Sequence, residues 1–287
     1  MTIQSPTTAA APSLSEQRQA DLPAQGQADS SGDKALPVRL QVIPSEGIAA
    51  RVQANAPAGT ALTVTCLPHQ GVGPTIRAAI ELAYLGYEVV PHLAARSVES
   101  RDQLAGIVRN CHDAGITEVF AVGGDAGKPA GPYESSLPVL EDLAELSGGT
   151  IRAGVAGYPE GHPGQSELHM LDALLEKQHL ASSVVTQLCF SASRVQWYAE
   201  TLRREGVRLP VWAGVAGAVP RAHLISLATK IGVGPSLKFL DRRGPLGRRL
   251  LKGGHYSPQS VLAELQCGGL VEGIHLYTFN HLAGPTN

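Results

Sequence analysis

Short runs of β-branched and other apolar residues alternate with longer amphipathic segments from residue 36 almost to the end of the chain. A run of four to eight such residues is typical of a buried strand, and apolar residues spaced three and four apart are typical of a helix. On this basis the sequence predicts eight strands: Val38–Ile43, Ala61–Cys66, Glu88–Leu93, Glu118–Val122, Ile151–Ala156, Ser183–Leu188, Leu209–Ala213 and Gly273–Phe279.

Most of the segments between these strands have helical spacing, such as the apolar residues at 76, 79, 80 and 83. Two further helices are predicted over Arg221–Ile231 and near Ser257–Gln266. Three glycines follow helical patterns where a left-handed residue would end a helix: Gly86, Gly115 and Gly206. Alternation of this kind predicts an α/β protein with a parallel sheet and crossover helices, and eight repeats favour a closed (β/α)₈ TIM barrel over an open doubly wound sheet.

The composition separates a tail from the predicted barrel. With 287 residues and 43% hydrophobic content, the chain can bury one large core. Residues 1–36 are instead rich in Ala, Ser, Gln and Pro and lack Phe, Tyr, Trp, Val and Cys, so they offer too little apolar surface to offset chain entropy. They have neither the basic start nor the apolar stretch of a secretory signal. We therefore expect a disordered tail over 1–36 and a single barrel domain over 37–287.

Charge, hydropathy and cysteine usage narrow the class of protein. A formal charge of -2 and an aromatic content of 5% give no reason to expect a nucleic-acid partner. No apolar run of about 18 residues appears, so no membrane span is expected. The four cysteines are far apart, without metal-ligand spacing: Cys66, Cys111, Cys189 and Cys267. They indicate reduced thiols in a cytoplasmic protein without a metal site. None of these patterns indicates an oligomeric state.

Polar and ionisable residues follow most of the predicted strands, where a TIM barrel carries its chemistry. The fifth strand is followed by Tyr158, Glu160 and His162, in a run that Pro159 and Pro163 stiffen. A packed surface turn is the alternative reading of this run. Because side chains without a function would be scattered over both ends of the barrel, their concentration at one end indicates a site.

Several motifs resemble methylenetetrahydrofolate reductases, in the same order along the chain. They are Pro91–Leu93 (PHL), Ala121–Asp125 (AVGGD), Gly157–Pro163 (GYPEGHP), Val185–Gln187 (VTQ) and His275–Asn280 (HLYTFN). The resemblance extends over about residues 38 to 280. It implies a (β/α)₈ barrel, FAD as the usual prosthetic group, and NADH or NADPH as the hydride source. The implied reaction is reduction of 5,10-methylenetetrahydrofolate, a small-molecule substrate, to 5-methyltetrahydrofolate.

The resemblance also implies roles for individual residues. Asp125 would stabilise the cationic iminium formed from the substrate, and its alternative role is to cap a loop. Gln187 would bind the pterin through its amide, which can both donate and accept, although a buried amide serving the backbone is the alternative. Phe190 and Trp197 suit either the core or a wall against the pterin, and Phe190 is taken as a substrate residue. The flavin-contact positions are Thr65, His92, Tyr133, Tyr158, His162 and Lys177, which could equally line a nicotinamide pocket.

The chain departs from the family at the proton donor. Where the family has a catalytic glutamate on the first strand, this chain has Gln41, and an amide cannot deliver a proton. Either water or another acid must act during ring opening. Glu46, Glu160 and His162 are the candidates, and Glu46 is favoured because it lies on the loop that follows the same strand.

A second departure concerns the flavin. Gly123 stands where the family has an arginine near the cofactor phosphates, and the helix after the fifth strand is about two residues shorter than the family pattern. We therefore expect flavin binding to be weak or absent, with hydride passing directly from NADH or NADPH to the substrate. The alternative is a folate-binding protein of the same fold without turnover.

Three weaker signals remain. The loop Pro68–Pro74 resembles a glycine-rich phosphate turn but more simply starts the second helix. A cluster of basic residues lies between the seventh and eighth strands: Arg242, Arg243, Arg248, Arg249 and Lys252. Its simplest interpretation is a solvated loop. The functional alternative is a docking site for the polyglutamate tail of folate or for a pyrophosphate. A Schiff-base lyase or aldolase is disfavoured because Lys128 is the only lysine near a strand end.

Overall fold

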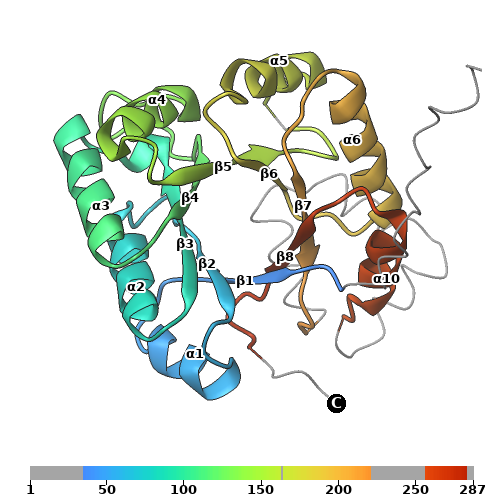
Figure 1. The fold of residues 1–287 in the computed structure, drawn as a ribbon, viewed down its shortest axis with the longest axis horizontal. Coiled ribbons are helices and arrows are strands. Elements are labelled where there is room, and N and C mark those ends of the chain that lie inside the picture. The colour runs from blue at the N-terminus through green and yellow to red at the C-terminus, as the bar shows by residue number, and fades with distance from the viewer. Residues whose placement is uncertain (1–34, 163, 221–255, 283–287) are drawn as a thin grey trace, which may run out of the picture. The chain divides into compact units, whose positions relative to one another are not determined.

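Eight parallel strands form a closed barrel in the computed structural model, which describes residues 35–162, 164–220 and 256–282. Each strand pairs with the next in sequence, and β8 closes the barrel by pairing with β1 (Figure 1). The strands are β1 (Val38–Val42), β2 (Ala61–Val64), β3 (Glu88–Ala94), β4 (Glu118–Val122), β5 (Arg152–Gly157), β6 (Ser183–Thr186), β7 (Val211–Ala216) and β8 (Gly273–Tyr277). The predicted fold is confirmed.

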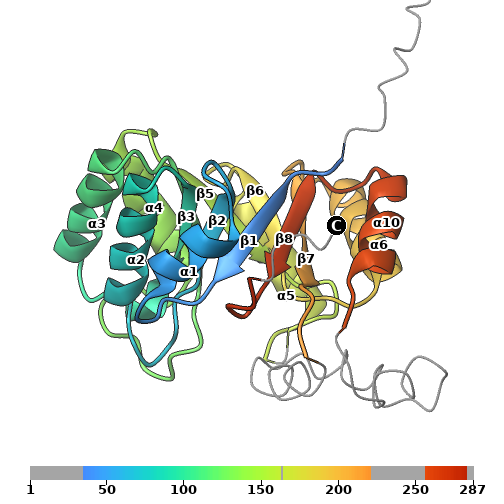
Figure 2. The same ribbon diagram turned by 90° about the horizontal axis from the view of Figure 1, so that it is seen from below.

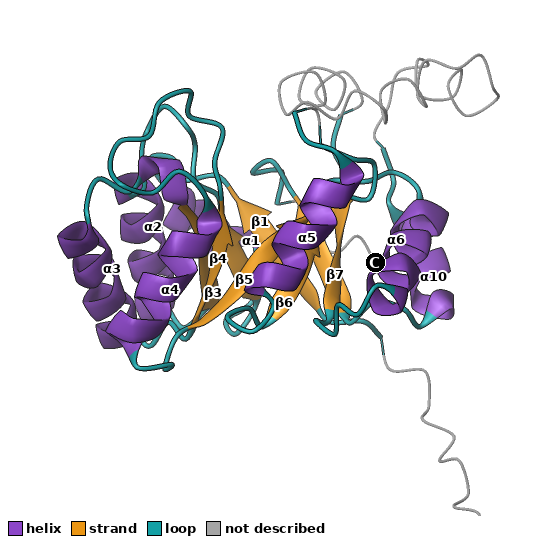
Figure 3. Ribbon diagram, turned by 90° about the horizontal axis from the view of Figure 1, so that it is seen from above, coloured by secondary structure: helices purple, strands orange, loops and turns teal. Residues whose placement is uncertain are grey.

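Helices surround the strands, as the side-on view shows (Figure 3). They are α1 (Ile48–Asn55), α2 (Gly73–Tyr84), α3 (Arg101–Asp113), α4 (Ser136–Ser147), α5 (Glu167–Lys177), α6 (Ala192–Arg204) and α10 (Gln259–Gly268), with a short 3₁₀ helix, η1 (Ala95–Ser97). The loop Pro68–Pro74 does lead into α2, whose first turn contains a proline. The predicted glycines after α2, α3 and α6 all have positive φ, of 86°, 72° and 92°.

Several strand bounds differ from the predicted ones. The seventh strand begins at Val211 and not at Leu209, because Pro210 has no N–H to donate to a strand ladder. The second, sixth and eighth strands end two residues earlier than predicted. At the eighth, the chain leaves the sheet because Phe279 and Asn280 take left-handed conformations, with φ of 50° and 63°.

Predictions for three segments lie outside the described residues. These are the tail over 1–36, of which only the last two residues are described, the helix expected over Arg221–Ile231, and the basic cluster at 242–252. The helix expected near Ser257–Gln266 is present as α10, two residues further along.

The main apolar core lies between the sheet and the helices. Side chains such as Leu62, Leu82, Leu104, Leu143 and Ile274 are almost fully buried there. Burial of this surface supplies most of the driving force for folding. A second set faces the barrel interior, where Val90, Phe120 and Val185 form a separate apolar cluster.

The end of the barrel where the strands begin is closed by charged and aromatic side chains. The Arg39 guanidinium on β1 donates to both carboxylate oxygens of Glu118 on β4, at 2.7 and 3.0 Å, and lies 4.0 Å above the Trp212 ring on β7. Arg152 donates to the same carboxylate at 3.3 Å. Figure 2 shows β1 and β8 side by side, with α1 outside them. Among the described residues, these side chains fill the barrel at the end where the strands begin.

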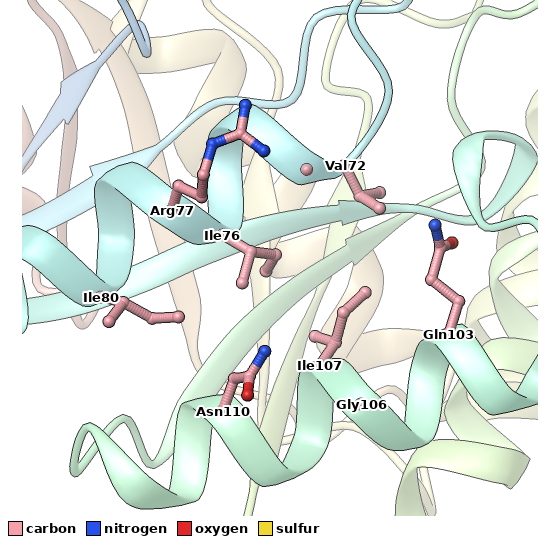
Figure 4. A pocket seen from close by; sticks show the side chains of 9 residues that line it. Val72, Ile76, Arg77, Ile80, Gln103, Gly106, Ile107 and Asn110 are labelled. Carbon is pink, nitrogen blue, oxygen red and sulfur yellow. The ribbon is translucent and has the colours of Figure 1, made fainter.

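A shallow apolar hollow lies on the outer surface between α2 and α3 (Figure 4). It has a volume of about 360 Å³, and Ile76 and Ile80 of α2 face Ile107 of α3 across it. Its lining offers few polar atoms and no pair of groups for acid or base chemistry. It also lies on the helical exterior of the barrel and not at the ends of the strands.

Candidate active site

Asp125 lies in the loop that follows β4 and is exposed. Gly124 before it has φ of +88°, and a Cβ there would lie 3.1 Å from the Cβ of Ala94 on the neighbouring strand. A glycine is therefore required for both the backbone conformation and the close approach. This turn places the carboxylate of Asp125 at the end of the barrel that is open to a ligand.

Tyr158 follows β5 and lies within electrostatic range of Asp125. Burial raises the pKa of Tyr158, and the Asp125 carboxylate raises it further, so the two groups are close enough to interact. Tyr158 packs edge-to-face on His162, with ring centroids 4.9 Å apart, and its backbone N–H donates to the Tyr198 hydroxyl at 3.2 Å. Tyr158 is therefore held in place by His162 and Tyr198, within electrostatic range of the Asp125 carboxylate.

Tyr277 brings the end of β8 to the same place. Burial raises its pKa, and Tyr158 raises it further. Its hydroxyl donates to the Thr186 carbonyl at 3.4 Å, which links the end of β8 to the end of β6. The ends of β4, β5 and β8 thus converge through Asp125, Tyr158 and Tyr277.

Gln187 follows β6 and belongs to this group. Its backbone N–H donates to the Gly157 carbonyl at 2.7 Å, and its side-chain oxygen accepts from the Leu188 N–H at 3.2 Å. A Cβ on Gly214 of β7 would lie 2.9 Å from the Gln187 carbonyl and 3.0 Å from the Tyr277 ring, so all three elements meet closely. The Gln187 amide nitrogen has no hydrogen-bond partner among the described residues.

The two aromatic residues that sequence reasoning left open have different environments. Phe190 is 9% exposed and packs edge-to-face on Tyr256, with centroids 5.7 Å apart, in a small cluster above the end of β6. Trp197 on α6 is 42% exposed, and the Arg194 guanidinium covers one face of its ring at 4.2 Å. Phe190 therefore lies near Gln187, whereas Trp197 belongs to the outer helical surface.

Gln41 faces into the barrel and is bound to His275. The Gln41 side-chain oxygen and His275 Nε2 are 2.7 Å apart, and Gln41 is 6% exposed. Because an amide oxygen can only accept, Nε2 of His275 must carry the hydrogen. The Thr278 hydroxyl donates to the Gln41 carbonyl, which fixes the backbone at the same point. This orientation leaves the Gln41 amide nitrogen as a free donor among the described residues.

The barrel interior around this pair is polar but uncharged. Burial lowers the pKa of His92 to about 3, and burial, His92 and Arg39 keep the pKa of His275 well below its usual value. Neither His92 Nε2, His275 Nδ1 nor the Thr63 hydroxyl has a hydrogen-bond partner within the described part of the chain. Orphaned buried polar atoms are costly, so these groups are suited to contacting a bound ligand or water.

The candidate proton donors occupy different positions. Glu46 is exposed in the loop before α1, and Asn280 holds this loop by bonding both the N–H and the carbonyl of Ile43, at 2.7 and 2.9 Å. Glu160 accepts from the Cys189 thiol at 3.5 Å, between the ends of β5 and β6. Burial and the charge of Glu160 raise the pKa of Cys189 to about 12. His162 Nδ1 accepts from the Gly164 N–H at 3.1 Å, which leaves Nε2 as its proton carrier.

The positions expected to contact a flavin offer a poor fit to FAD. The Tyr133 hydroxyl donates to Asp142 on α4 at 2.6 Å, and Tyr133 is 2% exposed. Lys177 donates to the Ser136 hydroxyl at 3.2 Å, and burial lowers its pKa. Gly123 offers no cation. Tyr133 and Lys177, two of the six expected residues, are therefore hydrogen-bonded to side chains of α4. Lys177 is also partly buried, so it does not offer an exposed charge to a phosphate.

The other expected cofactor positions are placed differently. His92, Tyr158 and His162 lie at or below the open end of the barrel. Thr65 follows β2, where its backbone N–H donates to the Val42 carbonyl at 3.0 Å. The structure thus retains groups that could surround a flat ring at this end of the barrel.

Arg96 was not identified from the sequence. It lies in η1, directly after β3, and its guanidinium donates to the carbonyls of Ala126, Gly127 and Glu134 in the loop after β4, at 2.6, 2.8 and 3.2 Å. A signal was available, because an arginine four residues after His92 stands near the end of a barrel strand. Sequence reasoning weighted the named motifs and passed over it.

The described residues contain no group of three or more His, Cys, Asp or Glu side chains that could hold a metal ion. All four cysteines are free. No helix within the described ranges is long and apolar enough to cross a membrane.

The fold is a TIM barrel with polar groups concentrated at one end of its strands. The family model for methylenetetrahydrofolate reductase matches residues 48–285, and the chain belongs to this family. The chain is 25% identical over 214 residues to a probable methylenetetrahydrofolate reductase (NADPH) of Caenorhabditis elegans. It is 24% identical over 218 residues to methylenetetrahydrofolate reductase 2 of Saccharomyces cerevisiae. These matches cover 71% and 70% of this chain but only 32% and 36% of the relatives, so the chain spans about a third of their length.

Solved structures of other barrels resemble the fold. An oxaloacetate acetylhydrolase matches with a TM-score of 0.55 and 10% identity, over 86% of this chain and 77% of that chain. A 2,3-dimethylmalate lyase matches with a TM-score of 0.54 and 12% identity, over the same shares. At this level of identity the likeness concerns the fold alone.

Proposed function

We propose that this protein reduces 5,10-methylenetetrahydrofolate to 5-methyltetrahydrofolate with a hydride taken directly from NADH or NADPH, without a tightly bound flavin. The observation that carries the proposal is the convergence of Asp125, Tyr158, Gln187 and Tyr277 at the open end of a family barrel. This arrangement combines one carboxylate with amide and aromatic groups, as a flat heterocycle that becomes cationic would require.

The reaction consumes the substrate, one reduced nicotinamide and one proton. The bond between the bridging methylene and the leaving amine breaks, the amine takes the proton, and the methylene becomes an iminium cation. Hydride then adds to this carbon and gives the methyl group. Asp125 is the anion proposed to stabilise the cation, since a carboxylate beside a developing positive charge lowers the barrier to its formation.

Gln187 is proposed to orient the pterin. Its side-chain oxygen is turned toward the Leu188 N–H, which leaves the NH₂ group free to donate to an acceptor on a ring edge. Phe190 would contribute apolar surface next to it. His92, Tyr158 and His162 are proposed to line the side on which the nicotinamide lies, with Thr65 at its edge.

The absence of tightly bound flavin is supported by the engagement of Tyr133 with Asp142 and of Lys177 with Ser136. Purified protein should therefore show no stoichiometric absorption band of oxidised flavin, and it should oxidise NADH or NADPH only when methylenetetrahydrofolate is present. A stoichiometric flavin band would overturn this part of the proposal. Comparison of the two nicotinamides in the same assay determines which one the protein prefers.

Glu46 is proposed as the acid that replaces the family glutamate. It stands in the loop after β1, and the Asn280 amide braces that loop against the end of β8. Glu46→Gln should lower kcat about a hundredfold or more, because general acid catalysis typically contributes that much. Unchanged turnover would remove Glu46, and Glu160→Gln and His162→Asn would then be compared in the same assay.

One observation favours a second candidate, a folate-binding protein without turnover. Gln41 stands at the position of the family acid and is held firmly by His275, so this group cannot protonate the substrate. This candidate predicts binding of methylenetetrahydrofolate with no oxidation of NADH or NADPH. A steady-state assay and a binding titration on the same sample separate the two functions.

A further inference from the structure

Arg96 holds the rim loop, residues 123–134, which follows β4. Its backbone N–H donates to the Gly123 carbonyl at 3.0 Å, and its own carbonyl accepts from the Ala130 N–H at 2.9 Å. Its guanidinium donates to three further carbonyls of the rim loop. With both backbone and side chain engaged, Arg96 has a defined orientation.

The positive charge of Arg96 is not neutralised by a carboxylate. No acidic side chain lies within 4.0 Å of it in the described part of the chain, whereas Arg101, five residues later, pairs with both Asp142 and Glu145 at 3.1 and 2.7 Å. A guanidinium has five N–H groups, and the three bonds to the rim loop leave two of them unused. Arg96 is partly exposed, and two of its three guanidinium bonds lie at exposed positions, so solvent reaches this side chain.

This charge lies at the edge of the candidate active site. Ala126, whose carbonyl accepts from Arg96 Nε, is the residue after Asp125. A Cβ on Gly124 would lie 3.9 Å from the Cβ of Arg96. Arg96 therefore lies within reach of the further groups of a ligand whose ring contacts Asp125.

We propose that Arg96 binds the diphosphate of the nicotinamide dinucleotide. This inference rests on the proposed use of NADH or NADPH. A guanidinium matches the paired oxygens of a phosphate, and charge-assisted hydrogen bonds of this kind are among the strongest in proteins. Because the rim loop already orients the guanidinium, little side-chain freedom is lost when the phosphate binds. Lys128, exposed on the same loop, supplies a second cation.

The test compares two ligands with the same reduced ring. NADH carries the diphosphate, and dihydronicotinamide riboside carries no phosphate. Binding is measured by fluorescence titration without folate, so no turnover is needed. Arg96→Gln should weaken NADH binding about tenfold or more while leaving the riboside within about twofold. Equal weakening of both ligands would show that Arg96 only supports the rim loop, and no weakening of either would remove it from the site.

Arg101→Gln is the matched control, because this arginine lies in the same segment but is neutralised by two carboxylates. It should change neither affinity. If Arg96→Gln does not fold, the wild-type protein still tests the proposal, since ADP should compete with NADH at least about tenfold better than adenosine does. Equal competition by ADP and adenosine would overturn it.

The outcomes also separate this inference from the proposed function. If NADH binding depends on Arg96 but methylenetetrahydrofolate is never reduced, the diphosphate site is supported and the proposed reaction is refuted. If methylenetetrahydrofolate is reduced but NADH binds no more tightly than the riboside, the diphosphate site is refuted and the proposed reaction is supported.

Discussion

Acid should destabilise this protein through the histidines inside the barrel, and His92 allows the size of the effect to be worked out. Burial lowers the pKa of His92 to about 3, whereas the usual value is 6.5. The unfolded chain therefore takes up a proton on this imidazole below about pH 6.5, and the folded protein does not until about pH 3. The contribution of His92 to the free energy of unfolding is constant above pH 6.5 and decreases as the pH falls from 6.5 toward 3.

Each pH unit in this window costs about 1.4 kcal/mol for one such group. At pH 4.5, two units below the unfolded value, His92 alone should cost about 2.7 kcal/mol. Burial also holds the pKa of His275 well below its usual value, so His275 adds a loss in the same direction. Since a domain is typically stabilised by only about 5–15 kcal/mol, this is a large fraction of the total.

Guanidinium denaturation of the wild type and of His92→Gln at several pH values between 7 and 4.5 measures the effect. Subtracting the two curves cancels the contribution of the carboxylates, and the difference should change by about 2.7 kcal/mol over this range. His112→Gln is the control, because the His112 side chain on α3 is 72% exposed. Parallel curves for the wild type and His92→Gln, or an NMR titration of His92 near pH 6.5, would refute the reasoning.

Three further substitutions test the site and its supports. Gln41→Glu places a carboxyl group beside His275, and kcat should rise about tenfold or more with a new acid limb in the pH–rate profile; a rate at or below that of the wild type would show that the proton arrives elsewhere. Asn280→Ala removes the amide that braces the loop after β1, which should cost about 1–3 kcal/mol in denaturation and raise KM for the substrate; unchanged stability and KM would contradict this role. Gly157→Ala places a methyl group 2.6 Å from a side-chain carbon of β6 and should lower the free energy of unfolding by about 1–3 kcal/mol. Gly127→Ala, with open space around its Cβ, should lower it by less, and equal losses would count against the packing argument.

The fold could be predicted from the sequence because its signal is local. Alternating strand and helix patterns identified all eight strands, and their number indicated a closed barrel. The errors concern the first and last residues of strands. At Phe279 and Asn280 the chain leaves the sheet because the Asn280 side chain bonds Ile43, which is 237 residues away in sequence. No local pattern encodes such a contact, so the strand appeared two residues too long.

The candidate site could likewise be predicted from the sequence only in part. Asp125, Tyr158 and Gln187 stand in motifs directly after strands, so the topology alone brings them to one end of the barrel. The binding of Gln41 to His275 joins residues 234 apart, and the clamp formed by Arg96 spans about 30 residues. These contacts depend on the register of the strands and on side-chain direction. For that reason the sequence indicated that Gln41 cannot deliver a proton, but not that His275 fixes its side chain.

The charges in the barrel are arranged in layers, and this arrangement bears on the chemistry. At the closed end Arg39 and Arg152 both pair with Glu118, and the middle holds His92 and His275 in their neutral form. A cationic iminium gains little from either layer. Stabilisation of the cation must therefore come from the open end, where Asp125 is the acidic residue next to Tyr158. Asp125→Asn, which keeps the shape and removes the charge, should lower kcat about a hundredfold or more while substrate binding changes little. Asp125→Glu should restore part of the rate, and equal losses in both variants would indicate that the residue acts through its shape and not its charge.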